Sequence, residues 1–137
     1  MEDTKLHLCH WFTVDDLNYL KMGGRLSAGA AFFGSMLSIK PVMHTSDEGK
    51  LVPVSKVRGR KASLEAIANK LGELGGNYDN STVFICHGDC IEDAKYVENI
   101  LKTKYGVKEV LINYTGAVIG SHSGPGTMAL FFLGSER

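Results

Sequence analysis

The sequence predicts an α/β (α+β) fold: a two-layer sandwich in which a mixed sheet of about six strands carries helices mainly on one face. Two observations favour this class. Short apolar segments typical of strands alternate with segments of helical periodicity, and a strand–helix–strand unit over 82–114 has the length of a crossover connection. The 137 residues, 44% of them hydrophobic, suffice for one core and are too few for two. We therefore expect a single domain over 1–137.

The N-terminal segment predicts a strand followed by two short helices. The segment "LHLCHWF" at 6–12 is rich in aromatic and apolar residues and is typical of a strand. Thr13 is the expected N-cap of the first helix, with Asp16 three residues later, and the glycine pair at 23–24 is expected to end this helix. A second short helix is expected over 26–37.

A β-hairpin is the expected structure of 39–57. Two strand-like segments flank the turn-forming sequence "SDEGK". Pro41 and Pro53 cannot donate hydrogen bonds to a ladder, so they favour an edge position or a non-bonded register for these strands.

The clearest helix is expected over 61–74, ended by the glycine pair at 75–76. Its apolar residues recur at helical spacing on one face, namely Leu64, Ile67, Ala68, Leu71 and Leu74. This face should pack against the sheet.

A strand over 82–87 and a helix over 90–105 are expected next. Asp89 is the predicted N-cap of this helix, Glu92 occupies the capping-box position, and Gly106 follows its last residue.

The remaining strands are expected over 109–114 and 127–133. The first of these completes the strand–helix–strand unit, which should be right-handed if its two strands are parallel neighbours.

Composition excludes several classes of function. Lys and Arg total 15, equal to Asp and Glu, so no overall field attracts nucleic acid or an anionic membrane. The longest apolar runs are far shorter than the roughly 20 residues of a membrane helix. The three cysteines, Cys9, Cys86 and Cys90, are odd in number and favour a reducing, cytoplasmic location without a disulfide framework.

The segment "GSHSGPG" surrounds His122 with Gly120, Ser121, Ser123 and Gly124. It lacks the glycine spacing of a dinucleotide fingerprint and the frame of a nucleophile elbow. Glycines permit close backbone approach, and an imidazole with hydroxyls suits a carboxylate or phosphate. The residues alone leave two interpretations open, a ligand-binding loop and a tight connection to the last strand.

The segment "KMGGRLSAGAAFFG" and its continuation place Arg25 before alternating small and bulky residues. Arg25 is either an anion-binding residue or a solvated surface charge. The bulky side chains either line a long apolar cavity or belong to the core; they are Phe32, Phe33, Met36 and Leu37.

The segment "KVRGRK" at 56–61 places Arg58 and Arg60 in a basic patch. This patch is either a docking site for an acidic protein or phosphorylated ligand, or a solvated strand end.

The segment "CHGDC" at 86–90 lacks the second pair of ligands that a zinc site needs. We therefore expect no metal and no cofactor, with Cys86 in the core.

Three stretches together resemble the DegV family of bacterial fatty-acid-binding proteins: "FTVDDLNYLKMGGRLSAGAAFFGSMLSIKPVM", "GKLVPVSKVRGRKAS" and "GAVIGSHSGPGTMALFF". The likeness runs from about residue 6 to residue 133. The resemblance implies that the chain is the C-terminal domain of a two-domain family, without the N-terminal domain, which is expected to hold hydroxyl residues for the fatty-acid carboxylate.

The resemblance implies a carrier that is not itself an enzyme. Such a protein buries a long-chain fatty acid between its domains and presents the carboxylate to a separate ATP-dependent kinase. The acyl phosphate then passes toward phospholipid synthesis. The implied partners are a fatty acid and the kinase subunit, with transient membrane contact allowed and no nucleic acid.

The resemblance also implies roles for particular residues. His122 matches the family histidine that hydrogen-bonds the carboxylate, within the loop at 120–124. Arg25 and Arg58 match arginines linked to the ligand site or to kinase docking, and Arg60 extends that patch. The apolar residues of 32–37 are candidates to line the acyl-tail tunnel.

Two other classes of function stay open. An acyl- or phosphoryl-transfer enzyme would use His122 as general base, but would need a nucleophile and an orienting carboxylate beside it. A protein-interaction module would use the patch around Arg58 without binding a ligand on its own.

Overall fold

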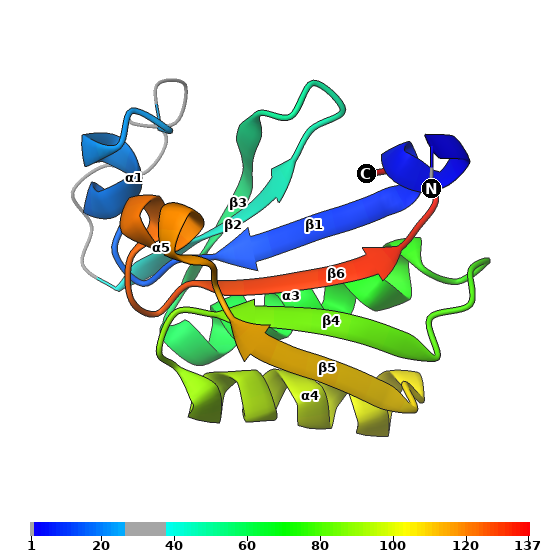
Figure 1. Cartoon of the computed structure of the whole chain (residues 1–137). Coiled ribbons are helices and arrows are strands. Elements are labelled where there is room, and N and C mark those ends of the chain that lie inside the picture. Colours follow the sequence, from blue (N-terminus) through cyan, green and yellow to red (C-terminus); the bar gives the residue numbers. More distant parts are fainter. Residues whose placement is uncertain (1, 27–37) are drawn as a thin grey trace.

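The computed structural model describes residues 2–26 and 38–137 (Figure 1). The second helix expected near the N-terminus therefore lies outside the described residues, apart from Leu26 at its start. The same holds for Phe32, Phe33, Met36 and Leu37, the expected tail-lining residues.

The predicted mixed six-stranded sheet is confirmed. Its strands are β1 (Leu8–Thr13), β2 (Ile39–Thr45), β3 (Leu51–Arg58), β4 (Thr82–His87), β5 (Glu109–Tyr114) and β6 (Met128–Leu133). They lie in the order β3-β2-β1-β6-β4-β5. Neighbours are antiparallel except β4 and β5, which are parallel, as the crossover unit predicts.

Two long helices cover one face of this sheet, α3 (Arg60–Leu74) and α4 (Ile91–Tyr105) (Figure 1). Two short helices, α1 (Asn18–Met22) and α5 (Ala117–Ser123), contact each other at one end of the sheet. A 3-10 helix, η1 (Glu2–His7), precedes β1. The two layers and the clustering of α3 and α4 on one face agree with the predicted sandwich.

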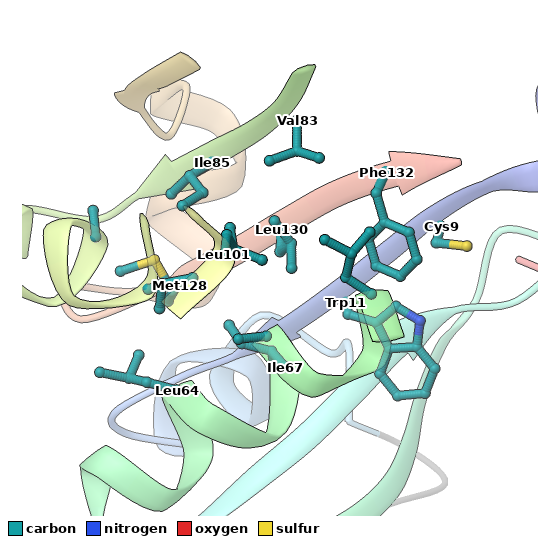
Figure 2. Packing of buried hydrophobic residues seen from close by; sticks show 14 of the residues in the cluster. Cys9, Trp11, Leu64, Ile67, Val83, Ile85, Leu101, Met128, Leu130 and Phe132 are labelled. Carbon is teal, nitrogen blue, oxygen red and sulfur yellow. The ribbon is translucent and has the colours of Figure 1, made fainter. Parts of the chain in front are cut away.

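The main core lies between the sheet and the two long helices (Figure 2). Alternate strand residues point to the same face of a sheet, so every second side chain of β1, β4 and β6 enters this core. These are Cys9, Trp11, Val83, Ile85, Met128, Leu130 and Phe132. The predicted stripe of α3 packs against them, with Leu64, Ile67, Ala68 and Leu71 buried and Leu74 partly buried.

The hairpin of β2 and β3 is confirmed, and it shows how the sheet tolerates both prolines. Pro53 lies in β3, an edge strand. Pro41 lies in β2, an inner strand, but β2 pairs with β1 only through His44 and Met43. Pro41 is therefore outside that ladder, and its missing N–H costs no hydrogen bond to β1.

The expected cap at Thr13 is wrong. Strand β1 runs to Thr13, which pairs with Met128 of β6, and α1 begins only at Asn18. Asp16 instead accepts a hydrogen bond from the backbone N–H of Asn18 (2.9 Å). Strand pairing with β6 thus overrides the capping signal, and the strand expected over 6–12 starts two residues later, after η1.

The expected cap at Asp89 is also wrong, although the end of the helix is predicted correctly. Asp89 adopts a left-handed conformation (φ 52°), and Cys90 is the N-cap, with no side-chain cap hydrogen bond. The backbone N–H of Cys90 donates to Nδ1 of His87 (3.1 Å). At the other end, Gly106 takes the left-handed conformation (φ 69°) expected of a helix terminator.

Over the described ranges, no helix has both the length and the apolar character needed to cross a membrane. Each of the three cysteines is free.

Candidate ligand site

The second face of the sheet, called here the open face, is not covered by α3 or α4 (Figure 1). It presents the strand residues that alternate with the core, including His10, Phe84, Cys86, Leu111 and Phe131. Phe84 is 49% exposed and Leu111 45% exposed. A contiguous apolar surface of this kind is typical of a binding face.

A smaller apolar cluster closes one end of the open face. Phe12 of β1 and Met43 of β2 pack there against Val14, Leu20 and Leu26. Leu20 is the buried residue of α1, so this cluster fixes the short helix over the end of the sheet.

A cavity of about 420 Å³ is lined by residues of the open face, α1, α5 and the β2–β3 hairpin. Its apolar lining comprises Phe12, Leu20, Leu51, Val118, Ile119, Ala129 and Phe131. Its polar lining comprises His10, Arg25, Thr45, Cys86, Thr115, His122, Ser123 and Thr127. No Asp or Glu is among the described residues that line it.

The segment around His122 is a helix and not the expected loop. The backbone N–H of Gly120 donates to the Gly116 carbonyl, and that of Gly124 donates to the Gly120 carbonyl (both 2.8 Å). Gly120, Ser121 and Ser123 therefore belong to α5, while Gly124 (φ 80°) ends it. The tertiary contacts of α1 with α5 override the low helix propensity of this sequence.

The hydroxyls beside His122 are used within α5. Ser121 Oγ donates to the Val118 carbonyl (2.7 Å), and Ser123 Oγ donates to the Ile119 carbonyl (2.9 Å). Such back-bonding satisfies the side chain locally.

His122 is held against the end of α1. A Cβ on Gly23 would lie 2.6 Å from Nδ1 of His122, closer than any real contact. Tyr19 of α1 likewise packs closely against the end of α5, because a Cβ on Gly124 would lie 2.5 Å from its ring. Glycine at positions 23 and 124 thus allows the two short helices to close on the imidazole.

Arg25 reaches the same cavity by a sharp turn of the chain. Gly24 has φ 70°, a conformation that favours glycine, and Arg25 Nη1 donates to the Gly23 carbonyl (2.5 Å). Gly23 therefore contacts both side chains: its carbonyl accepts from Arg25, and its Cα faces His122. A guanidinium and an imidazole in a cavity lined by no described carboxylate suit an anionic group.

The other two predicted arginines lie away from this cavity. Arg58 is exposed at the end of β3. Arg60, the first residue of α3, donates from Nε to Asp93 Oδ2 (2.8 Å) and from Nη2 to the Gly126 carbonyl (2.6 Å). Arg60 thus ties α3 to α4 and to the turn that follows α5.

Most residues of the cavity escaped the sequence analysis, among them His10, Cys86 and Thr115. The core position expected for Cys86 is wrong, because alternation along β4 places it on the open face, where burial raises the thiol pKa. Burial, and secondarily Arg137, lowers the pKa of His10. Strand alternation was the available signal, but using it requires knowing which face is covered.

The residues of "CHGDC" form no metal centre in the structure. His87 is buried and accepts the Cys90 N–H, while Cys86 lines the cavity on the opposite side of the sheet. Within the described part of the chain, no group of three or more His, Cys, Asp or Glu residues is placed to hold a metal ion.

Comparison with known sequences links this architecture to one family. The family model described as "Uncharacterised protein, DegV family" matches residues 1–135. A DegV domain-containing protein of Clostridium perfringens is 48% identical over 137 residues, which are 100% of this chain and 47% of that protein. Protein DegV of Bacillus subtilis is 36% identical over 130 residues, 95% of this chain and 46% of that protein. The chain thus spans about half the length of these relatives.

Comparison with solved structures gives the same family. A fatty-acid-binding DegV family protein from Streptococcus agalactiae has a TM-score of 0.83 and 36% identity, covering 95% of this chain and 46% of that one. DegV from Bacillus subtilis, described as a fatty-acid-binding protein, has a TM-score of 0.73 and 36% identity, covering 98% and 47%. A Thermus thermophilus DegV family protein, described by its fatty-acid binding, has a TM-score of 0.77 and 29% identity, covering 93% and 45%.

Proposed function

The chain belongs to the DegV family, and we propose that it binds a long-chain fatty acid as part of a carrier protein. The observation that carries the proposal is the largely apolar cavity on the open face, which both Arg25 and His122 line. Relatives also support the proposal, because the three solved proteins above are described as binding fatty acids.

The carboxylate binds at the end of the cavity formed by α1 and α5. His122 donates a hydrogen bond to it, and the Arg25 guanidinium supplies a positive charge nearby. Serine hydroxyls contribute less than the sequence suggests, because those of Ser121 and Ser123 are already bonded to carbonyls of α5. Gly120 and Gly124 act through the shape of α5 and its end.

The acyl tail supplies most of the affinity. Each buried methylene contributes about 0.8 kcal/mol, and the cavity is walled by Phe12, Leu20, Leu51 and Phe131. The acyl tail is also lined by Phe32, Phe33, Met36 and Leu37. Only the apolar character of these residues supports this part of the proposal.

The protein acts as a carrier that presents the carboxylate to a separate ATP-dependent kinase, for acyl-phosphate formation and phospholipid synthesis in the cytoplasm. The chemistry beside His122 favours a carrier over an acyl- or phosphoryl-transfer enzyme. Neither neighbouring serine hydroxyl donates to the imidazole, and no described Asp or Glu lines the cavity to orient it. Arg58, exposed at the end of β3, is the docking residue for the kinase.

The chain corresponds to the C-terminal domain of a two-domain protein, and the other domain covers the open face. Two features support this assignment: the chain matches about half the length of its relatives, and apolar side chains of the open face and α5 are exposed. Among these, Val118 is 77% and Ile119 63% exposed.

Native mass spectrometry tests the proposed function. Two proteins are compared, the 137-residue chain and a two-domain fusion in which the N-terminal half of the Clostridium perfringens relative precedes it. We expect a C16–C18 acid to co-purify with the fusion, or to bind one-to-one after incubation. If neither protein binds fatty acid in excess ligand, the carrier proposal is wrong and the interaction-module alternative is favoured.

A further inference from the structure

Helix α5, which carries His122, depends on contacts outside itself for its position. It has only seven residues and no side-chain cap hydrogen bond, and so short a helix is not stable alone in water. Among the described elements it packs chiefly against α1. The connections at its two ends therefore help to decide where the imidazole lies.

The turn that follows α5, residues 124–127 and called here the GPG turn, is fixed to the end of β4. The Gly126 N–H donates to the Gly88 carbonyl (2.6 Å), and the Gly88 N–H donates to the Thr127 carbonyl (2.8 Å). Within the turn, Thr127 Oγ1 donates to the Gly124 carbonyl (2.7 Å). The GPG turn is thus a hydrogen-bonded unit that meets the sheet on one side.

Arg60 joins the same turn to the helical layer. Its Nη2 donates to the Gly126 carbonyl (2.6 Å), while its Nε donates to Asp93 Oδ2 (2.8 Å). The Arg60 side chain is only 20% exposed, and a hydrogen bond from a guanidinium is stronger than one between neutral groups. Arg60 does not line the cavity, so it acts on a ligand there only through other residues.

The path from Arg60 to His122 is short. The GPG turn begins at Gly124, the C-cap of α5, two residues after His122. On the other side, the imidazole lies against Gly23 and the ring of Tyr19 lies against Gly124, both so closely that a Cβ on either glycine would overlap them. A displacement of the GPG turn would therefore move the last turn of α5 against α1, and His122 with it.

We propose that Arg60 is a positioning residue. Its bond to the Gly126 carbonyl holds the GPG turn, and through it the end of α5, so that His122 has the orientation that binds the carboxylate. The inference rests on the proposed function and adds a residue to the same site. It gives Arg60 a role separate from its ion pair with Asp93 and from partner docking by the basic patch.

Two substitutions perturb this path at different points. Arg60→Met removes the bond to the Gly126 carbonyl. Gly126→Ala leaves Arg60 intact but distorts the GPG turn, because Gly126 has φ 81° and a Cβ there would lie 2.6 Å from Cβ of Asp15.

Asn80→Ala is the control for a loss of stability without a change at α5. Asn80 precedes β4, at the end opposite Gly88, and makes three hydrogen bonds to the backbone of Gly75 and Leu133. Its removal should destabilise the fold without moving the GPG turn.

The first measurement is the affinity of each variant, in the two-domain fusion, for a C16 acid and for its methyl ester. Arg60→Met and Gly126→Ala should each reduce the preference for the acid by about three- to tenfold, the effect of misaligning one hydrogen bond to a charged group. Asn80→Ala should keep the preference within about twofold of the parent, because distant sites act independently.

The second measurement needs no ligand. The NMR signals of the His122 ring, identified by their absence from His122→Ala, should shift in Arg60→Met and Gly126→Ala and stay in place in Asn80→Ala.

The proposal is wrong if Arg60→Met keeps the acid preference of the parent. It is also wrong if Asn80→Ala loses as much of that preference, since Arg60 would then only stabilise the fold. If the parent binds no acid, the proposed function fails, and the His122 signals still decide the positioning role: unshifted signals in Arg60→Met would refute it.

Discussion

Gly23 and His122 are in such close contact that a Cβ at position 23 would lie 2.6 Å from the imidazole Nδ1. The same glycine accepts a hydrogen bond from Arg25. One residue of α1's C-terminus thus positions both basic groups of the proposed carboxylate site, although neither group is near the other in sequence.

Gly23→Ala should displace the imidazole and weaken fatty-acid binding. The added methyl group has no room unless His122 moves, and overpacking of this kind costs about 1–3 kcal/mol. Calorimetric titration with a C16 acid measures the loss. Gly76→Ala is the matched control, because a Cβ there meets nothing within 4 Å. Unchanged affinity in Gly23→Ala would show that this contact does not position His122.

Substitutions of Arg58 and Arg60 should affect stability differently, although both residues belong to one basic motif. Arg60→Met removes a guanidinium bonded to Asp93 and to the Gly126 carbonyl, and should lower the free energy of unfolding by about 1–3 kcal/mol. Arg58→Met removes an exposed charge and should leave stability within about 0.5 kcal/mol of the parent. Urea unfolding of both variants measures this difference, and equal destabilisation would contradict the assignment.

The proposed kinase-docking role of Arg58 has its own test. Arg58→Glu should slow acyl-phosphate formation by the kinase while leaving fatty-acid affinity unchanged, because Arg58 is not among the residues that line the cavity. Equal loss of both activities would place Arg58 in the ligand site instead.

Thr115→Val should stabilise the ligand-free protein. Replacing an unpaired buried hydroxyl by a methyl group removes a desolvation cost, so we expect a gain of up to about 1 kcal/mol. Thr127→Val breaks a hydrogen bond and should lose about 1 kcal/mol. Thermal unfolding of the two variants checks the sign of each change. Destabilisation by Thr115→Val would mean that its hydroxyl has a partner in the ligand-free protein.

Stability should fall in alkali because of Cys9. Burial raises the thiol pKa from 9.0 to about 11, so the folded state keeps a proton that the unfolded state has already lost. The free energy of unfolding should therefore decline as pH rises from 9 toward 11, by about 2–3 kcal/mol from this group. Denaturant unfolding at pH 8 and pH 11 measures the decline. Cys9→Ala should show a smaller one, and an identical decline would exclude Cys9 as the cause.

Elements with strong periodicity were predictable from sequence. The apolar stripe of α3 and the strand β4 have the expected positions, since the side chains that define them are the ones the core buries. The N-terminal ends of α1 and α4 were not predictable, since Thr13 and Asp89 are not the caps that their sequence positions indicate. Thr13 is held in β1 by pairing with Met128, and Cys90 rather than Asp89 is the N-cap of α4, where its backbone N–H donates to His87. The first interaction joins strands that are far apart in the sequence, whereas the second joins residues three positions apart and depends on how the His87 side chain is placed at the end of β4.

The candidate site was predictable in part. Arg25 and His122 belong to motifs that can be read locally, and the structure brings them to one cavity. Local sequence does not place Thr115 and Cys86 in the cavity lining, because their positions there follow from strand order and from which face α3 and α4 cover. The different roles of Arg58 and Arg60 were likewise not predictable from sequence, since they depend on the contacts of Arg60 with Asp93 and Gly126.

The central claim is that a fatty-acid carboxylate binds at His122. The most direct measurement compares the affinities of a C16 acid and its methyl ester for the parent two-domain fusion and for its His122→Ala variant, with Ser121→Ala as control. The parent and Ser121→Ala should bind the acid at least tenfold more tightly than the ester, and His122→Ala should lose most of that difference while still binding the ester. Equal affinity of the parent for acid and ester, or an undiminished difference in His122→Ala, would contradict the account.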